Sequence, residues 1–342
     1  MIRNMRLVRA ASIAALVIAT PAQAALVCAD TGDEIQAALD QVMSIGEDAT
    51  IRIVAGTYAR PFYLSLTEQA PTIDISGGWN AGCTAQDGES TILDGQHAHQ
   101  ILYMDSFGSA RAQVRISRLT FVGGEAPDST FGGVPGGLDI WGTAGIVIEQ
   151  NQFIGNAADT HTPAALGVYG PGSGLLILRN NLFVANTGQR AAFVNDSSTA
   201  AVISGNTFVA NTSNASSTGG LVLDGSAAYV IANNILWNNT GGDLYLAGSG
   251  GQYLFHNDIG FVGGTPIAPG SEGNLSVAPQ FASGLLNFRL APDSPLVNRG
   301  FDLSSGDIGA WDLAGGERLQ GVHVDIGAYE SDVLLRDGFD PG

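Results

Sequence analysis

Short runs of alternating apolar and polar residues, separated by turns rich in glycine and polar side chains, recur along most of the chain. From residue 136 onward these runs form a repeated unit: an apolar strand, a polar turn, a second apolar strand, and then Asn followed two residues later by a large apolar side chain. The unit recurs about every 25–30 residues, a spacing typical of solenoid proteins. Its clearest copies are Asn151-Gln152-Phe153, Asn181-Leu182-Phe183 and Asn206-Thr207-Phe208, followed by Asn156, Asn186 and Asn211 respectively.

One such unit cannot bury its apolar face alone, but stacked units pair their strands in parallel at ~4.8 Å and bury alternate side chains. The sequence therefore predicts an all-β, right-handed parallel β-helix with Phe153, Phe183 and Phe208 in one interior column. Asparagine suits the turns because it tolerates left-handed backbone and its amide can bond to the equivalent Asn of the next coil. We interpret these asparagines as structural. A leucine-rich repeat has a similar period, but the regular leucine spacing that it requires is absent.

Both ends of the repeated region carry sequences suited to covering the terminal coils. Thr31 and Glu34 match a capping box, and Ile35, Leu39 and Val42 fall on one helical face, which predicts an N-terminal capping helix. Strands are expected at 50–54, 72–75, 91–93 and 101–104. From residue 263 onward, prolines interrupt regular stacking and predict an irregular C-terminal cap. The expected organisation is a leader at 1–24, an N-terminal cap with the first coils at 25–75, the β-helix at 76–262, the cap segment at 263–330 and a short tail at 331–342.

The first 24 residues have the pattern of a secretory signal peptide, with three arginines, an apolar run at 10–19 and a small-residue cleavage site before Ala25. The run is too short to span a membrane, and no later segment reaches the required length. Export favours a disulfide between Cys28 and Cys83, because exported proteins meet oxidising conditions. Two separate thiols or a metal site are the alternatives. Without histidines at ligand spacing, the sequence predicts no metal site.

The charge balance limits the classes of partner. The chain contains no lysine, and its 14 basic residues face 32 acidic ones, giving a formal net charge of −18. Such a surface repels phosphate backbones, so nucleic acid is not an expected partner. The same charge opposes polyanionic sugars unless bound Ca²⁺ screens or bridges the two, which makes Ca²⁺ the one cofactor to consider.

Several further motifs resemble those of choice-of-anchor Q domain proteins, a bacterial family within the pectin-lyase-like superfold. The motifs are at residues 53–58 (IVAGTY), 76–80 (SGGWN), 91–95 (TILDG), 294–298 (SPLVN) and 324–330 (VDIGAYE). The resemblance implies a parallel β-helix and an exported protein, secreted or held at the surface of a Gram-negative bacterium. It implies fold and location more strongly than an activity, because one superfold hosts unrelated functions.

Enzymes of this superfold suggest where to look for chemistry. Those that resemble pectate lyases carry several acidic Ca²⁺ ligands on the outer face of one parallel sheet, and this chain has one carboxylate among the positions expected to face outward there. Those that hydrolyse polygalacturonan combine aspartates with a Gly-His-Gly segment, which this chain lacks. The expected outward positions are Asp139, Gly167, Val194, Val222 and Tyr245.

The best remaining candidate is a shallow groove between two long inter-coil loops, at residues 123–136 and 155–164. Trp141 and Tyr169 follow equivalent strands in adjacent coils, so their rings are expected to offer flat faces to sugars. Carboxylates beside the rings would accept hydrogen bonds from sugar hydroxyls. Ordinary exposed aromatic and acidic residues are the competing interpretation. The residues expected at the groove are Asp128, Asp139, Trp141, Asp159, His161 and Tyr169.

These features favour a non-enzymatic secreted or surface protein that binds carbohydrate or another cell-envelope component. The first alternative is a polysaccharide lyase or glycoside hydrolase with an unfamiliar arrangement around Asp139, Asp159, His161 and Arg190. The second is a structural adhesin. The oligomeric state is not determined by the sequence.

Overall fold

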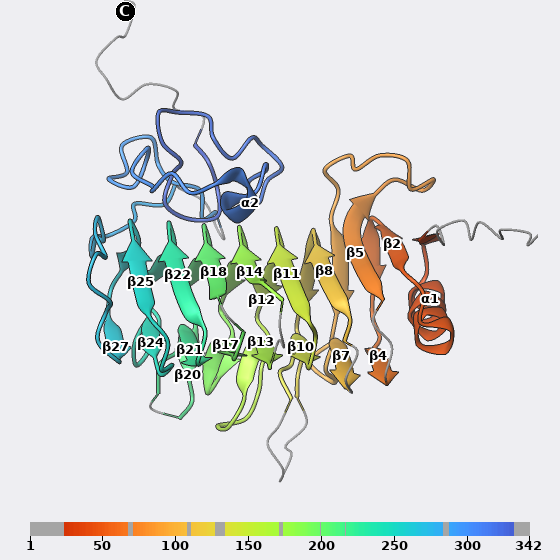
Figure 1. Ribbon diagram of the computed structural model, residues 1–342. Coiled ribbons are helices and arrows are strands. Elements are labelled where there is room, and N and C mark those ends of the chain that lie inside the picture. The colour runs from red at the N-terminus through yellow and green to blue at the C-terminus, as the bar shows by residue number, and fades with distance from the viewer. Residues whose placement is uncertain are drawn as a thin grey trace, which may run out of the picture.

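The protein forms an elongated stack of coils built from three long parallel sheets (Figure 1). The computed structural model describes residues 24–67, 71–107, 111–126, 134–170, 174–198, 200–215, 217–282 and 287–331. Each complete coil contributes one strand to sheet 1, then one to sheet 2, then one to sheet 3, and neighbouring coils pair in parallel. This arrangement confirms the predicted parallel β-helix.

The strands of each sheet follow one another along the stack. Sheet 1 contains β1 (Ala25–Ala29), β2 (Ala49–Val54), β5 (Thr72–Trp79), β8 (Gln113–Ser117), β11 (Gly145–Glu149), β14 (Leu176–Arg179), β18 (Ala200–Ser204), β22 (Ala228–Ala232) and β25 (Gln252–Phe255). Sheet 2 contains β3 (Gly56–Tyr58), β6 (Thr91–Asp94), β9 (Leu119–Val122), β12 (Gln152–Ile154), β15 (Leu182–Val184), β19 (Thr207–Val209), β23 (Ile235–Trp237) and β26 (Asp258–Ile259). Sheet 3 contains β4 (Phe62–Thr67), β7 (Leu102–Phe107), β10 (Leu138–Trp141), β13 (Pro163–Tyr169), β17 (Arg190–Asp196), β21 (Leu221–Gly225), β24 (Leu244–Leu246) and β27 (Val262–Gly264). A small fourth sheet pairs β16 (Thr187–Gly188) with β20 (Thr212–Ser213).

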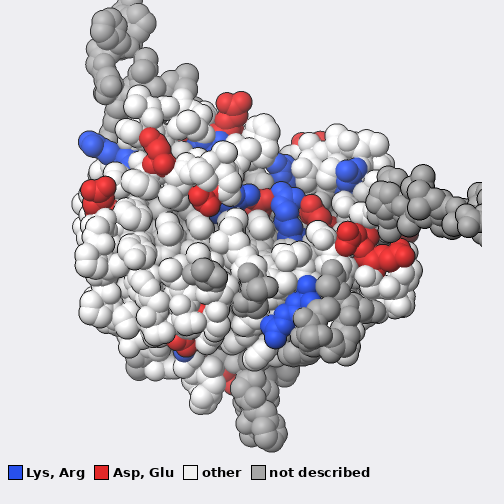
Figure 2. Space-filling model, viewed as in Figure 1, with Lys and Arg blue, Asp and Glu red and all other residues white. Residues whose placement is uncertain are grey.

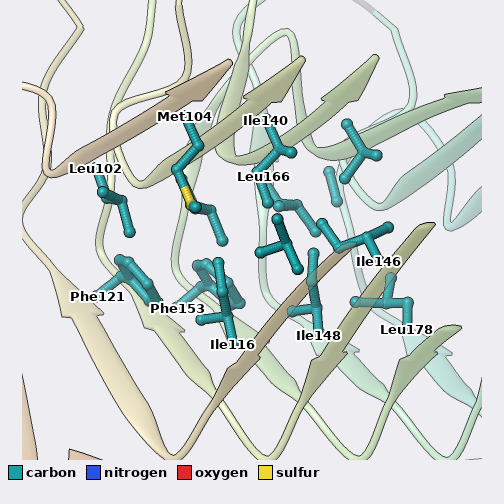
Figure 3. Close-up of a cluster of buried hydrophobic side chains, with 14 of the residues drawn as sticks. Leu102, Met104, Ile116, Phe121, Ile140, Ile146, Ile148, Phe153, Leu166 and Leu178 are labelled. Carbon is teal, nitrogen blue, oxygen red and sulfur yellow. The ribbon is translucent and has the colours of Figure 1, made fainter. Parts of the chain in front are cut away.

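Like side chains lie above like side chains in the core. Phe121, Phe153, Phe183 and Phe208 are fully buried and stack face to face, with ring centroids 4.8, 4.6 and 4.2 Å apart. Figure 3 shows the first two of these rings beside aliphatic side chains that the other two sheets send into the same interior. The interior column predicted from the repeats is confirmed.

The recurring asparagines form two continuous ladders inside the turns. In each ladder the side-chain oxygen of one Asn accepts hydrogen bonds from the backbone N–H and the amide of the Asn one coil before it, as at Asn151 and Asn181, where these distances are 2.9 and 3.2 Å. Because buried polar groups need hydrogen-bond partners, the ladders supply these partners to the polar groups of turns that water does not reach. The first ladder contains Asn151, Asn181, Asn206, Asn234, Asn257 and Asn274, and the second contains Asn156, Asn186, Asn211 and Asn239.

The N-terminal end of the stack is covered by α1 (Gly32–Ile45), whose apolar face lies on the first coil. The side chain of Thr31 accepts a hydrogen bond from the Glu34 N–H at 3.2 Å, and the Glu34 carboxylate accepts one from the Asp30 N–H at 2.9 Å. The predicted capping helix is therefore present. A disulfide between Cys28 and Cys83 ties β1 to the loop after β5, as expected from export.

The irregular C-terminal part does more than cover the last coil. Residues 265–277 lie on that coil, where the Leu275 N–H donates to the Asn257 carbonyl. The chain then returns along the turns between sheets 1 and 2, above β14 to β25 in Figure 1, and includes α2 (Ser305–Ile308). We call residues 298–331 the return segment. Amides of Gln150, Asn180 and Asn233 donate to its backbone carbonyls at 2.6, 2.7 and 2.9 Å.

Charged side chains are sparse on the face that sheet 1 presents in Figure 2, and those present lie in mixed groups. Arg115 and Arg179 both bind the carboxylate of Glu149, and Arg115 also binds Asp74 at 3.0 Å. The charges of both arginines are thus neutralised locally. In the described ranges, no helix has the length and apolar character needed to cross a membrane.

Candidate functional site

The outer face of sheet 3 carries most of the candidate site residues that the sequence predicted. Asp139 pairs with Gly167, and further along the sheet Val222 pairs with Tyr245. Since Leu138 and Ile140 face the core, these four residues lie in the outward column, as expected. A second outward column, two residues further along each strand, contains Asp105, Trp141 and Tyr169.

One predicted outward residue was placed wrongly. Val194 is fully buried and faces the core, and Phe193 pairs with Gly167 in the outward column instead. The pairing of β13 with β17 shifts register after Pro163, and the small Ala192 takes the inward position opposite a leucine of β13. A one-residue shift exchanges the two faces of a strand, which is why the assignment failed.

Five aromatic side chains lie on this face, one from each of five consecutive coils, in two adjacent columns: Tyr63, Tyr103 and Phe193 in the column of Asp139, and Trp141 and Tyr169 in the second. Tyr63 stacks on Tyr103 with ring centroids 5.3 Å apart, and Trp141 stacks on Tyr169 at 4.1 Å. The Tyr169 ring lies 5.5 Å from that of Phe193 in a tilted arrangement. We call these five residues the aromatic row. Trp141 is 36% exposed and Tyr63 is 47% exposed, so both retain surface for a ligand.

Asp139 lies beneath the aromatic row with no exposed surface. Its Oδ2 accepts a hydrogen bond from the Trp141 Nε1–H at 2.9 Å, while its Oδ1 has no partner among the described residues. Burial, opposed by the Trp141 hydrogen bond and aided by the carboxylate of Asp105, raises the pKa of Asp139 to about 7. A side chain at Gly167 would collide with Tyr169, so the glycine lets that ring approach Asp139.

A neighbouring polar group was not singled out from the sequence. Asp105 is buried in the second outward column beside Trp141, and it accepts a hydrogen bond from the Ser65 hydroxyl at 2.5 Å. Burial and a hydrogen bond with Asp105 raise the pKa of Tyr103. The signal was present in the sequence, because the alternation in β4 and β7 places Ser65 and Asp105 outward.

Arg190 reaches the aromatic row from the start of β17. Its guanidinium lies 4.9 Å from the ring centroid of Phe193, a cation–π contact. Burial lowers the pKa of Arg190, although the acidic groups of Tyr169 and Asp224 favour its charged form. The structure thus brings Arg190 to the same face as Trp141, but shows no hydrogen bond between Arg190 and Asp139.

Asp159 and His161 lie elsewhere, in the loop that leads into β13. Asp159 accepts hydrogen bonds from the His161 N–H at 2.8 Å and from the Thr162 hydroxyl at 2.7 Å, so its carboxylate closes its own turn. Burial raises the pKa of Asp159, but these hydrogen bonds and His161 outweigh it and lower the pKa overall. Four residues of β13, or ~13 Å, separate Pro163 from Gly167. No hydrogen bond or ion pair among the described residues joins Asp159 or His161 to Asp139. Asp128 lies outside the described residues.

The described carboxylates and histidines do not gather into a metal centre. No group of three or more His, Cys, Asp or Glu side chains in the described ranges is arranged to hold a metal ion. The face instead offers flat rings with hydrogen-bonding groups between them. Such surfaces suit sugars, whose rings combine apolar faces with hydroxyls.

The comparisons with known proteins bear on the fold. A family model described as the right handed beta helix region matches residues 73–260, which span the regular coils of all three sheets. No curated protein and no solved structure matches the chain. Because the family model covers more than half of the sequence and the sheets have the corresponding topology, the chain belongs to the right-handed β-helix family.

Proposed function

We propose that this protein is exported and binds carbohydrate, without catalysis, through the aromatic row on the outer face of sheet 3. The observation that carries the proposal is the pair of ring stacks on one face, Trp141 on Tyr169 and, two residues earlier along the strands, Tyr63 on Tyr103. Five adjacent parallel strands span ~19 Å, which suits an extended oligosaccharide better than a single sugar. The acidic side chains Asp105 and Asp224 near the row favour a neutral glycan over a polyanionic one.

Export is part of the proposal. It is supported by the leader pattern at residues 1–24 and by the Cys28–Cys83 disulfide, which persists in oxidising compartments. The motifs similar to choice-of-anchor Q domain proteins support the same location, at the surface of a Gram-negative bacterium or outside it. Fractionation of cells that produce the full chain would test this, and retention of the uncleaved protein in the cytoplasm would refute it.

Binding is tested by titrating the mature protein with neutral oligosaccharides chosen from a glycan array. Tyr63→Ala and Trp141→Ala should each weaken binding about three- to tenfold, since each removes one stacking partner. Tyr253→Ala is the matched control, because Tyr253 is a similarly exposed tyrosine on sheet 1. Equal losses in all three variants, or no glycan bound at millimolar concentration with or without Ca²⁺, would refute the proposal.

A polysaccharide lyase or glycoside hydrolase is the second candidate, favoured by Asp139. A buried carboxyl with a pKa of about 7 and an unpartnered oxygen is typical of a general acid or base. Against catalysis, the Asp139 carboxyl has no exposed surface through which a sugar would reach it. Release of unsaturated or reducing sugars by the purified protein, abolished by Asp139→Asn, would favour the enzyme. Binding without release would favour the first proposal.

A further inference from the structure

A polar cavity of about 350 Å³ lies on a different side of the stack, between the return segment and the turns joining sheets 1 and 2. Its volume falls in the range of small-molecule sites. The walls come from the loop after β5, from two successive turns and from the return segment. The side chains that matter most are Gln86, Arg118, Gln150, Gln152, Arg289 and Tyr329.

Arg118 belongs to a column of turn residues that otherwise hold the return segment. Register places Arg118 one coil before Gln150 and two before Asn180, and all three have left-handed backbone, with φ between 54° and 57°. Gln150 and Asn180 use their amides to bind carbonyls of the return segment. Arg118 has no such bond to any described carbonyl, and its side chain lines the cavity instead.

Arg289 contributes a second positive charge to the same cavity. Its guanidinium lies 5.0 Å from the ring centroid of Tyr329, which holds it at the wall. No described carboxylate forms an ion pair with Arg118 or Arg289. Glu89, which also lines the cavity, is exposed and pairs with neither. Two guanidiniums without ion pairs therefore line one cavity, a local concentration of positive charge in a chain whose net charge is −18.

We propose that this cavity binds a small anionic sugar whose carboxylate or sulfate lies between Arg118 and Arg289. Guanidinium groups bind such oxyanions with paired, charge-assisted hydrogen bonds. Gln86, whose amide donates to the Gly77 carbonyl at 2.7 Å, and Gln152 also line the cavity, and their side-chain oxygens can accept hydrogen bonds from hydroxyl groups. Burial and the neighbouring Arg115 lower the pKa of Arg118 against the opposing effect of the Glu149 carboxylate, so a bound anion would also stabilise its charged form. This site is separate from the aromatic row and does not depend on the function proposed for it.

The proposal is tested by calorimetric titration of the mature protein with glucuronate, glucose 6-sulfate and glucose. Both anions, or one of them, should bind, more weakly at high salt, and glucose should not. Comparison of the two anions identifies the acidic group that the cavity prefers. Arg118→Asn and Arg289→Gln should each weaken binding on the order of tenfold, the value of one charge-assisted hydrogen bond.

The variants are chosen to separate binding from folding. Asparagine already occupies the left-handed turn position at Asn180 and Asn233, so Arg118→Asn keeps a compatible backbone. Arg299→Gln is the matched control, because Arg299 is an exposed arginine outside this cavity. The proposal would be overturned if glucose bound as tightly as the anions, or if neither anion bound. Unchanged affinity in the Arg118 and Arg289 variants would also overturn it. Tyr63→Ala should leave anion binding intact, which distinguishes this site from the aromatic row.

Discussion

Replacement of Asn181 by Ala removes one complete rung from the first asparagine ladder. The Asn181 amide donates to the Ile148 carbonyl at 2.9 Å and to Asn206 Oδ1 at 2.9 Å. Its oxygen accepts from the Asn151 backbone N–H at 2.9 Å. Asn181 is fully buried, so water does not replace these bonds. The substitution therefore leaves polar groups unpaired inside the stack.

The magnitude follows from counting those groups. The Asn151 N–H loses its partner, and the Ile148 carbonyl loses the amide that binds it. Asn206 Oδ1 still accepts from the Asn181 backbone N–H, so it remains satisfied. The Arg179 carbonyl and the Asn151 amide also bond to the Asn181 side chain, but they keep the Gln150 N–H and the Ile116 carbonyl as partners. Two buried groups at ~1–3 kcal/mol each give an expected loss of about 4 kcal/mol in the free energy of unfolding.

Urea denaturation followed by circular dichroism measures this loss. Asn274→Ala is the control, because Asn274 ends the same ladder and is exposed, so water can bond to the groups that it leaves. The control should cost less than about 1 kcal/mol. If Asn181→Ala cost no more than Asn274→Ala, the ladder would not stabilise the buried turns in the way described.

Four further changes test other parts of the structure. Asp139 has a pKa of about 7 in the folded protein and about 3.9 in the unfolded chain, so the folded state binds more protons between pH 4 and 7. The free energy of unfolding should therefore fall by on the order of 4 kcal/mol as the pH rises over this range. Denaturation of Asp139→Asn across the same range should lack this fall. Phe183→Ala should lower the unfolding free energy by about 3–5 kcal/mol, because the ring is buried between two others, and a cost below 1 kcal/mol would contradict that packing. Replacing Cys28 and Cys83 together with serine should cost about 2–4 kcal/mol, measured against the oxidised parent, and no change would mean that the bridge constrains little. Thr31→Ala should cost about 1 kcal/mol through loss of the helix cap, with Thr31→Ser as the neutral control.

The regular coils were predictable because their signals are local and repeated. Phe153 and Asn151 recur at equivalent positions in later coils, and each recurrence independently supports the same stacking. Among the strands that were missed, β1 and β4 both alternate between outward and inward residues. In β4, Phe62 and Leu64 are buried while Tyr63 is exposed, so the signal existed.

The candidate site was predicted less completely than the fold. Trp141 and Tyr169 were placed in adjacent coils because their strands align without interruption. The outward residue of β17 was predicted wrongly, since it is Phe193 rather than Val194. The large Phe193 ring points outward while the small side chain of Ala192 points into the core, the opposite of the usual arrangement. Side-chain size alone therefore does not assign the two faces of a strand.

The return segment and its cavity had no sequence signal that reveals their position. The contacts that place the segment join residues far apart in the sequence, such as Gln150 and Asp312, which are 162 positions apart. Its backbone is irregular, so no periodic pattern marks which side chains face the coils. Local reasoning identifies the segment as non-repetitive but not the surface on which it lies.

The return segment also fixes the number of coils between its attachment points on the solenoid. In an ordinary repeat protein each coil contacts only its neighbours, so evolution can add or delete one without disturbing the rest. Here Phe301, Ile308 and Asp312 are fastened to three particular coils. One extra coil between those attachment points would displace them by ~4.8 Å, further than a hydrogen bond can stretch. Relatives that differ in length should therefore gain or lose coils outside the stretch that the return segment spans, or change the length of the return segment as well.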